Sequence, residues 1–522
     1  MITFAILHYK GIKMGKLSGE LLISNFYKIV DGLDEVMVDD RLMHRIKDNH
    51  DFLLNFCNDK IIYGVNTGFG PMAQYRVSDE DRIQLQYNLI RSHSSGSGKV
   101  LPAEFVRAAM LARLNSLLQC KSAVHPSVIH VLVELLNKEI YPIVFEHGGV
   151  GASGDLVQLA HIALVLIGEG EVLYKGQRRN TSEVFELENI APILVTLREG
   201  LALMNGTSFM TGIGLVNLSK AQNLLHWSVA CSSIINEIVG AYDDHFSEEL
   251  NAVKLHSGQN EIAQMMRVHL SDSQLTKKRH EHLYSGKVNE MFFQEKVQEY
   301  YSLRCVPQIL GPVFDTLFSA EKVLFNELNS ANDNPIIDHE SKQVYHGGNF
   351  HGDYVALEMD KMRLAITKTT MLAERQLSFL LNPRLNDVLP PFVNRLVLGL
   401  NFGMQGAQFT ATSTTAENQM LSNSMYVHSI PCNNDNQDIV SMGSNAALIT
   451  HKVIENAFEV LSIELITIVQ AVRHLGQFNQ LSRKSQDILK KLESLVPDVL
   501  EDKPLYPIIE QVKNMLVENI YD

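Results

Sequence analysis

The chain has little of several features that would mark a specialised class of protein. It has 522 residues but only five cysteines, at positions 57, 120, 231, 305 and 432, and no CxxC pair. Widely spaced cysteines favour reduced thiols over a disulfide framework or a zinc site. No apolar run reaches the roughly 18 residues of a membrane span, and Ile2–Leu7 is too short for a signal peptide. These absences predict a cytoplasmic protein that does not associate with a membrane.

Positive charge is also scarce. The chain has 45 Lys and Arg against 59 Asp and Glu, which gives a formal net charge of -14. An excess of negative charge argues against nucleic acid and against an anionic membrane as partners. With 45% hydrophobic and 20% charged residues, the composition is that of an ordinary globular protein.

Proline and strand-like segments are rare over long stretches of the chain. No proline occurs between Pro192 and Pro307 or between Pro431 and Pro497, and amphipathic helical patterns run through 211–242 and 444–475. The strand-like segments are short and lie at 61–65, 171–174 and 343–345. We therefore expect a mainly α-helical fold with a long central bundle.

The same patterns predict two parts. A loop-rich N-terminal part spans 1–205, and a part with long helices spans 206–522. We interpret residues 1–15 as a dispensable extension, because the helical pattern begins near Gly19.

The segment Gly149–Asp155 supports two interpretations. Gly149-x-Gly151-x-x-Gly154 satisfies the dinucleotide-binding fingerprint, and a helical pattern follows it. That fingerprint also requires further alternating strands and helices, and the pattern downstream lacks them. A phosphate-binding loop is therefore the weaker interpretation.

The stronger interpretation is an electrophile made from Ala152, Ser153 and Gly154. Attack of the Gly154 amide nitrogen on the Ala152 carbonyl, followed by loss of two waters, gives a 4-methylidene-imidazol-5-one ring. Ala152 is small, Ser153 carries the hydroxyl that leaves, and Gly154 offers an unhindered nitrogen in a backbone that bends sharply.

Several polar or glycine-rich segments interrupt the apolar patterns. They are Tyr63–Gly70, Asn205–Thr207, Tyr301–Gln308, Asn332–Pro335, Gly347–His351 and Asn433–Asp438. Tyr301 and Arg304 are three residues apart and would share one face of a helix. Taken singly, each segment is more typical of a turn than of a site. His346 and His351 lack a third ligand at a suitable spacing, so we predict no metal site.

Taken together, these motifs resemble one known family. Residues from about 60 to 445 are similar to the aromatic amino acid ammonia-lyases, which act on histidine, phenylalanine or tyrosine with a methylidene-imidazolone prosthetic group. The matching motifs are Tyr63–Gly70, Gly151–Leu156, Gly200–Thr207, Tyr301–Arg304 and Gly347–His351. The resemblance implies a fumarase/aspartase-like helical architecture and a homotetramer whose active sites combine residues from three chains. It also implies that the ring made from Ala152, Ser153 and Gly154 is the cofactor and that no diffusible cofactor is needed.

The resemblance also implies a role for each matching residue. Tyr63 would remove the β-proton and Tyr301 would assist proton transfer beside the ring. Arg304 would hold the substrate carboxylate as a bidentate fork, with help from Asn334. The remaining substrate-binding positions are Gly70, Ser92, His93, Asn205, Phe350 and Gln437. Asn205 would hydrogen-bond the ring, and Phe350 would pack beside it.

Substrate choice depends on two positions. Ser92-His93 occupies the position that contacts the substrate ring in this family, and a polar pair there suggests a polar ring. Histidine lyases also carry Ser-His, but they have a glutamate where this chain has Gln437, and an uncharged amide suits a phenol better. The sequence therefore favours tyrosine ammonia-lyase activity, which yields trans-p-coumarate and ammonia in amino acid catabolism. Histidine ammonia-lyase, which forms urocanate, remains an alternative, as do a tyrosine aminomutase and a non-catalytic helical scaffold.

Overall fold

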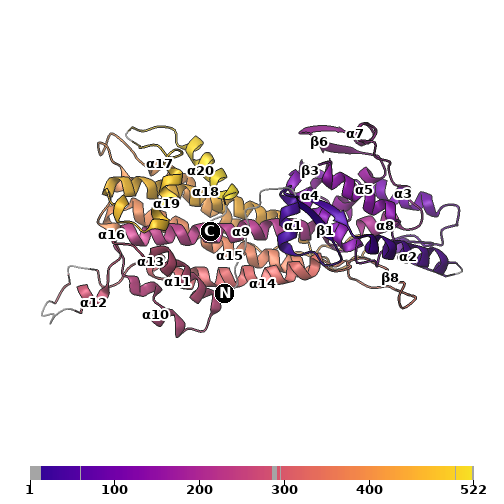
Figure 1. Cartoon of the computed structure of the whole chain (residues 1–522), viewed down its shortest axis with the longest axis horizontal. Coiled ribbons are helices and arrows are strands. Elements are labelled where there is room, and N and C mark those ends of the chain that lie inside the picture. Colours follow the sequence, from indigo (N-terminus) through magenta and orange to yellow (C-terminus); the bar gives the residue numbers. More distant parts are fainter. Residues whose placement is uncertain (1–12, 59, 285–290, 294–295, 500, 520–522) are drawn as a thin grey trace. The chain divides into compact units, whose positions relative to one another are not determined.

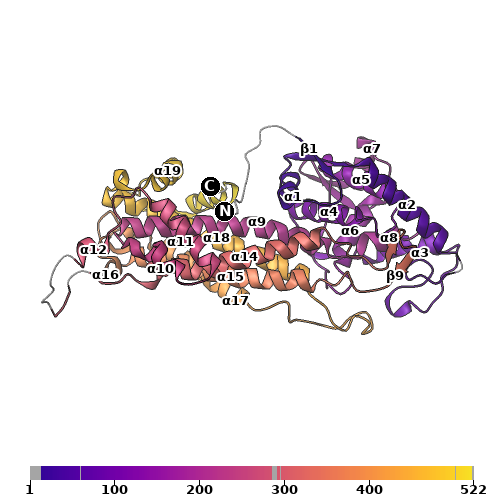
Figure 2. The ribbon, with the colours of Figure 1, turned by 60° about the horizontal axis from the view of Figure 1, so that its bottom comes forward.

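The structure is a computed structural model that describes residues 13–519 except 59, 285–290, 294–295 and 500 (Figures 1 and 2). Within these residues, every helix is too short or too polar to cross a lipid bilayer. Residues 1–12 lie outside the described part, so the dispensable extension proposed for 1–15 stays a prediction.

Long helices dominate the chain, which confirms the predicted mainly helical fold. The four longest are α9 (Ser208–Ile238), α14 (Val306–Leu328), α15 (Asp353–Leu381) and α18 (Gly443–Leu475). The helices α9 and α18 correspond to the patterns at 211–242 and 444–475. Both are followed by a glycine at positive φ, Gly240 at 63° and Gly476 at 63°, which is a conformation that favours glycine and ends a helix.

The strands form small, separate sheets. β1 (Lys13–Leu17) pairs in parallel with β2 (Asp34–Val38). The antiparallel strands are β3 (Ser97–Val100) with β5 (Phe145–His147), β4 (Tyr141–Pro142) with β6 (Glu171–Tyr174) and β7 (Gln177–Asn180), and β8 (Ile336–Asp338) with β9 (Gln343–Tyr345).

Two of the three predicted strands are confirmed, at 171–174 and 343–345. The third, at 61–65, is wrong. Residues 62–66 form a tight turn in which Val65 N and Asn66 N both donate to Ile62 O, at 3.1 and 3.3 Å. Ile62 and Val65 are buried in a hydrophobic cluster with Leu53, Leu197 and Ile337, so their burial needs no strand partner.

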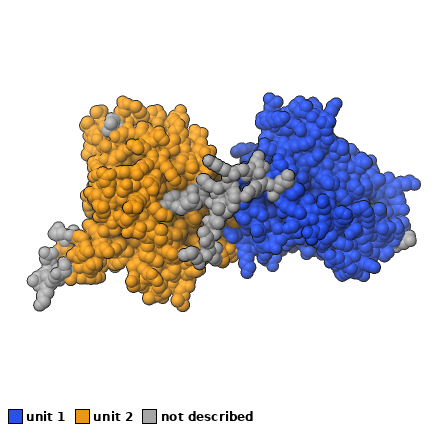
Figure 3. Space-filling model, viewed as in Figure 1, with its two compact units in different colours: residues 1–217, 320–360, 424–449 blue, residues 218–319, 361–423, 450–522 orange. Residues whose placement is uncertain are grey.

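The chain divides into two compact units (Figure 3). Unit 1 comprises 1–217, 320–360 and 424–449, and unit 2 comprises 218–319, 361–423 and 450–522. Each unit therefore joins three separate stretches of chain. The boundary expected near residue 205 divides the chain at a single point, and it stays a prediction.

Shorter helices complete both units. In unit 1 they are α1 (Ile23–Val30), α2 (Asp40–Phe56), α3 (Arg82–His93), α4 (Ala103–Leu117), α5 (Pro126–Asn137), α6 (Leu156–Leu166), α7 (Thr181–Glu188) and α8 (Glu199–Met204). In unit 2 they are α10 (Glu248–Ala252), α11 (Ser257–Leu270), α12 (Arg279–His282), α13 (Tyr301–Arg304), α16 (Pro383–Asn386), α17 (Gln405–Leu421), α19 (Arg483–Leu492) and α20 (Tyr506–Glu518).

Three helices of unit 1 matter most for function, because each packs against the other two. They are α3, α6 and α8 (Figure 2). In α6, Leu159, Ala160, Ile162 and Ala163 are almost completely buried, as expected for a helix that is apolar on most of its surface. This packing brings together the C-terminal ends of α3 and α8 and the N-terminal end of α6, where the polar motifs lie.

Candidate active site

A cavity of about 470 Å³ lies where these three helix ends meet. Its lining includes nine of the thirteen predicted site residues: Tyr63, Gly70, Ser92, His93, Ala152, Ser153, Gly154, Asn205 and Gln437. These residues come from segments far apart in the sequence, and all of them belong to unit 1. The fold therefore assembles one site from motifs that are separately uninformative.

One face of α3 lines the cavity, and the sequence analysis identified only its last turn. The lining residues are Leu85, Asn88, Leu89, Ser92 and His93, spaced as i, i+3, i+4, i+7 and i+8. Counting back from Ser92 at this helical spacing would have found the others. Asn433, from the polar segment before α18, also lines the cavity and was not among the predicted site residues.

The turn at Ala152-Ser153-Gly154 is tightly constrained. Gly154 has φ +74° and forms an isolated parallel bridge with Gly206. A Cβ atom added to Gly154 would lie 1.9 Å from the Gly206 carbonyl oxygen. The next residue, Asp155, donates its amide to that same oxygen at 2.9 Å. Only glycine fits at position 154, which leaves its nitrogen as unhindered as the cyclisation requires.

Two side chains that lie 52 and 284 residues after Ser153 hold it in place. Asn205 Nδ2 donates to the Ser153 carbonyl oxygen at 3.0 Å, and Gln437 Nε2 donates to Ser153 Oγ at 2.8 Å. Cys432 Sγ donates to Gln437 Oε1 at 3.2 Å, which fixes the orientation of the Gln437 amide. Asn205 Oδ1 is buried and has no hydrogen-bond partner among the described residues.

Asp155, the residue that follows this turn, connects the turn to two neighbouring segments through its carboxylate. It is fully buried, and its carboxylate accepts from Met210 N at 2.8 Å and from Ser444 Oγ. Burial raises the pKa of Asp155 to about 6, although these hydrogen bonds lower it. Because Met210 lies in the first turn of α9, Asp155 ties the start of that helix to the start of α6.

Tyr63 lies on the loop that closes the cavity. Its hydroxyl oxygen accepts from Gly70 N at 3.0 Å, and its ring meets Phe69 edge to face at 6.0 Å between centroids. Its backbone amide donates to His346 Nε2 at 3.3 Å. Burial lowers the pKa of His346, which keeps that nitrogen available as an acceptor.

His93 is held in one tautomer. Its Nδ1 lies 3.0 Å from the Leu89 carbonyl oxygen and 3.0 Å from Ser92 Oγ, whose hydroxyl donates to the same carbonyl at 3.2 Å. Because the carbonyl can only accept, its contact with His93 assigns the proton to Nδ1. Burial lowers the pKa of His93, which favours the neutral imidazole. The nitrogen left to accept a hydrogen bond from a ligand is therefore Nε2.

Four predicted site residues do not line the cavity. Tyr301 and Arg304 belong to unit 2, where the Arg304 guanidinium lies over the Tyr301 ring at 4.8 Å, as expected for residues three apart in α13. Asn334 does not contact the cavity, and its Oδ1 accepts from Gly347 N at 2.8 Å. Phe350, three residues after Gly347 in the sequence, is half-buried. The described lining residues include no Arg, Lys, Asp or Glu.

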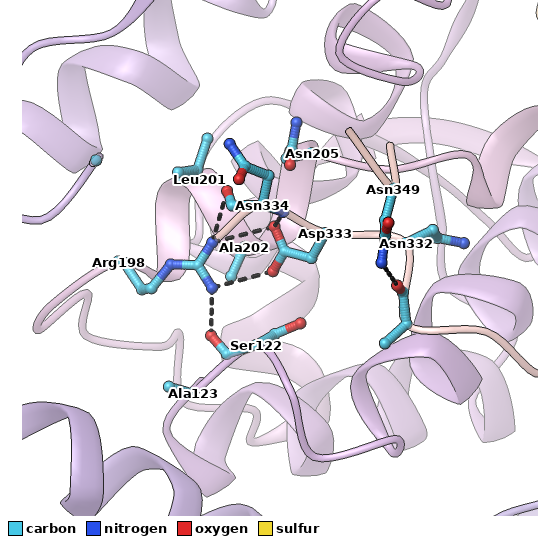
Figure 4. A network of polar contacts seen from close by, with 12 residues as sticks. Ser122, Ala123, Arg198, Leu201, Ala202, Asn205, Asn332, Asp333, Asn334 and Asn349 are labelled. Atoms are coloured by element: carbon cyan, nitrogen blue, oxygen red, sulfur yellow. Dashed lines mark hydrogen bonds and ion pairs between the residues drawn. The ribbon is translucent and has the colours of Figure 1, made fainter. Parts of the chain in front are cut away.

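A buried ionic network holds Asn334 and the start of α8 (Figure 4). Arg198, immediately before α8, donates to both carboxylate oxygens of Asp333 at 3.0 Å and to Asn334 O at 3.1 Å. Arg198 also donates to Ser122 O at 2.7 Å. The Arg198 and Asp333 side chains are 0% and 1% exposed. Removing one partner of such a pair costs about 3–5 kcal/mol, so the network fixes the backbone that leads to Asn205.

Comparison with known proteins agrees with these motifs. The sequence model of the family described as aromatic amino acid lyase matches residues 21–494. The chain belongs to this family. The aromatic amino acid lyases and aminomutases depend on the methylidene-imidazolone group, so this chain is a carbon–nitrogen lyase or aminomutase of that kind.

Individual relatives of this lyase differ in their reactions. A tyrosine 2,3-aminomutase of Myxococcus sp. (strain Mx-B0) is 38% identical over 505 residues, 95% of each chain. A histidine ammonia-lyase of Geobacillus sp. (strain WCH70) is 38% identical over 459 residues, covering 88% of this chain and 87% of that protein. The crystal structure of a tyrosine aminomutase from Streptomyces globisporus superposes with a TM-score of 0.93 at 35% identity, over 97% of each chain.

The residues of this lyase fit the prosthetic group that the family uses. Gly154 is glycine by steric necessity, Ser153 lines the cavity, and the orphaned Asn205 Oδ1 lies beside it. Once formed, the group supplies an electrophile that accepts electrons as the carbon–nitrogen bond breaks. Among the described residues, no cluster of three or more His, Cys, Asp and Glu side chains could hold a metal ion.

Proposed function

We propose that this lyase eliminates ammonia from L-tyrosine to give trans-p-coumarate, with the electrophile formed by the chain itself from Ala152, Ser153 and Gly154. The observation that carries the proposal is the neutral His93 in a cavity whose described lining residues include no Arg, Lys, Asp or Glu.

His93 favours a substrate with a hydrogen-bond donor at the far end of its ring. Its proton is on Nδ1, bonded to Leu89 O, so Nε2 can only accept. The hydroxyl of tyrosine donates to such an acceptor, whereas phenylalanine has no group to offer. A site built to hydrogen-bond a hydroxyl discriminates strongly against an analogue without it.

The lining also favours a phenol over an imidazole. A histidine substrate is partly cationic near neutral pH, and an acidic side chain would stabilise it. The described lining residues include no Asp or Glu, and Gln437 is neutral and donates to Ser153 Oγ. An uncharged phenol needs no counter-charge.

Tyr63 is the group we assign to removal of the β-proton. It lines the same cavity as Ser153, and its oxygen accepts a hydrogen bond from Gly70 N, the contact that a phenolate would also make. Asn205 holds the peptide of Ser153 and keeps the electrophile in place.

The substrate carboxylate requires a cation, and the described part of the cavity lining contains no Lys or Arg. Arg304 carries the family motif for this role, and it lies in unit 2 beside Tyr301. We infer a homotetramer in which Tyr301 and Arg304 reach the cavity from another copy of the chain. Asn334 and Phe350 would complete the substrate-binding side.

A second candidate is a tyrosine 2,3-aminomutase, which returns the ammonia to the neighbouring carbon and forms β-tyrosine. It is favoured by the relatives that carry this name, at 37–40% identity. Both candidates share the substrate and the electrophile, and they differ in whether the unsaturated acid leaves before ammonia adds again.

Incubation of the purified protein with L-tyrosine, L-phenylalanine or L-histidine separately tests the proposal. We expect p-coumarate and ammonia as the main products, with Ser153→Ala as the inactive control. Urocanate as the dominant product would contradict the assignment of the substrate, and β-tyrosine as the dominant product would establish the second candidate.

A further inference from the structure

A second cavity, of about 690 Å³, adjoins the loop that carries Tyr63. Its lining includes Lys60, Asn66, Thr67 and Arg76, while Tyr63 and Gly70 of the same loop line the substrate cavity. The loop therefore forms part of the wall of both cavities.

The charges in the second cavity are unusual for this chain. Among the described lining residues, three side chains are basic, Lys60, Arg76 and Arg82, and one, Asp79, is acidic, although the whole chain has a net charge of -14. Asp79 pairs with Arg82. Among the described residues, neither Lys60 nor Arg76 forms an ion pair, although Lys60 Nζ lies over the Phe56 ring at 4.5 Å from its centroid. The buried Arg82 Nε has no hydrogen-bond partner among these residues. Uncompensated positive charge in a concave site raises the local concentration of anions.

The polar groups of the loop are already used within the loop. Asn66 Nδ2 donates to Lys60 O at 2.6 Å, and Asn66 Oδ1 accepts from Ile62 N at 2.9 Å. Thr67 Oγ1 accepts from Gly64 N at 3.1 Å and donates to Gly68 O at 2.9 Å. The groups left to bind a ligand are therefore the basic side chains and the side-chain amides of Asn58 and Gln74, which also line the cavity.

We propose that this cavity, which we call the anion cavity, binds a small oxyanion with at least two negative charges, either a phosphate compound or a polycarboxylate. The ligand lies among Lys60, Arg76 and Arg82, because guanidinium groups form paired hydrogen bonds with carboxylate and phosphate oxygens. The volume of the anion cavity is within the range of small-molecule sites.

Binding there also acts on the loop that carries Tyr63. Thr67 and Arg76 form an isolated antiparallel bridge, and Val77 N donates to Asn66 O at 3.0 Å, so residues 66–77 close on themselves. An anion that bridges Lys60 and Arg76 stabilises this closed form, in which Tyr63 faces the substrate cavity. This consequence rests on the proposed role of Tyr63, whereas the anion binding itself does not.

Titration calorimetry with pyrophosphate and with citrate, at constant ionic strength, tests the proposal on the full chain carrying Ser153→Ala. This background has no electrophile, so the result is independent of the proposed reaction. We expect saturable binding of at least one probe, and the tighter probe shows which oxyanion class the cavity prefers. Addition of Lys60→Gln and Arg76→Gln should weaken binding at least tenfold. The matched control is Lys175→Gln with Arg179→Gln, on the β6–β7 hairpin, and it removes the same charge without affecting binding.

Limited proteolysis measures whether the probe stabilises the closed form of residues 66–77. Tyr75 is 71% exposed, and cleavage after it by chymotrypsin should slow at least threefold when the probe is saturating. The single variant Arg76→Gln should lose most of this protection, and it serves if the double variant does not fold. Absence of saturable binding, or equal binding by the double variant and the parent, would overturn the proposal.

Discussion

At the scale of single residues, the proposed function depends on hydrogen bonds that fix the orientation of Ser153 and the tautomer of His93. Ser153 is held through its hydroxyl and its carbonyl by side chains 284 and 52 residues away. His93 is held by its own helix through Leu89 O. In water, a serine side chain rotates freely and a neutral histidine exchanges between two tautomers. The contacts seen here restrict both residues, and a single substitution can test each of them.

Ser153 should be consumed in forming the electrophile. The intact mass of the purified chain should fall short of the translated sequence by two waters, because cyclisation and elimination each release one. Ser153→Ala has no hydroxyl to lose, so we expect a smaller mass deficit and loss of nearly all turnover. A wild-type protein of full translated mass and normal activity would contradict this assignment.

His93→Phe should shift the preference from tyrosine toward phenylalanine. The substitution removes the acceptor for the phenol hydroxyl, and leaving that group unpaired costs about 1–3 kcal/mol. The ratio of kcat/KM for tyrosine to that for phenylalanine should therefore fall by about tenfold or more. His93→Gln, which keeps an acceptor, is the control and should retain more of the preference for tyrosine.

At the scale of elements, the long helices carry polar groups that their packing does not satisfy. Glu464 lies in the middle of α18, is fully buried, and neither of its carboxylate oxygens has a hydrogen-bond partner among the described residues. Burial raises the pKa of Glu464 well above its usual range. Burial and the nearby Glu464 together also raise the pKa of the Cys231 thiol. A buried carboxyl group without a hydrogen-bond partner lowers the free energy of unfolding of the protein.

Glu464→Gln should raise the thermal stability of the protein at pH 8. Because the folded pKa is raised, the protonated form is favoured in the folded state, and the cost appears as the pH rises above the usual range of a glutamate. We expect Tm to increase by about 2 °C or more at pH 8 and the gain to shrink toward pH 5. Glu459→Gln in the same helix is the matched control, since Glu459 is half-buried and accepts from Thr414 Oγ1 at 2.8 Å. A gain that does not depend on pH would show that the charge of Glu464 is not the cause.

At the scale of the whole molecule, the residues that we propose for catalysis and substrate binding are divided between two units. The cavity with Tyr63 and Ser153 belongs to unit 1, and Tyr301 and Arg304 belong to unit 2. The lining residues that the structure describes include no Lys or Arg for the substrate carboxylate. Sites shared between copies of the chain would supply that cation, and a tetramer should be measurable by light scattering.

Mixing two inactive variants tests shared sites directly. Tyr63→Phe removes the proposed base, and Arg304→Ala removes the proposed carboxylate ligand, so each homotetramer should be nearly inactive. Co-expressed chains that form mixed tetramers should recover about one quarter of wild-type activity, since one site in four then receives both native residues from different chains. Mixed tetramers that remain as inactive as the two parents would show that each site draws both residues from one chain.

The sequence alone predicted the electrophile chemistry and determined the helical class of this protein, for a physical reason. Cyclisation needs a small residue, a hydroxyl and an unhindered nitrogen in consecutive positions, and a long amphipathic pattern is a local property of the chain. Both are therefore visible in the order of residues, as at Ala152-Ser153-Gly154 and in α18.

Only the tertiary structure decided which residues, far apart in the sequence, contact one another. Residues 61–65 are a turn and not a strand, because contacts within the turn replace a strand partner. The contact of Gly154 with Gly206, the Gln437–Ser153 hydrogen bond and the Arg198–Asp333 pair each join residues far apart in sequence. No local pattern encodes such pairs, since their partners are chosen by packing. The tautomer of His93 likewise depends on its distance to one carbonyl oxygen, which the fold of α3 sets.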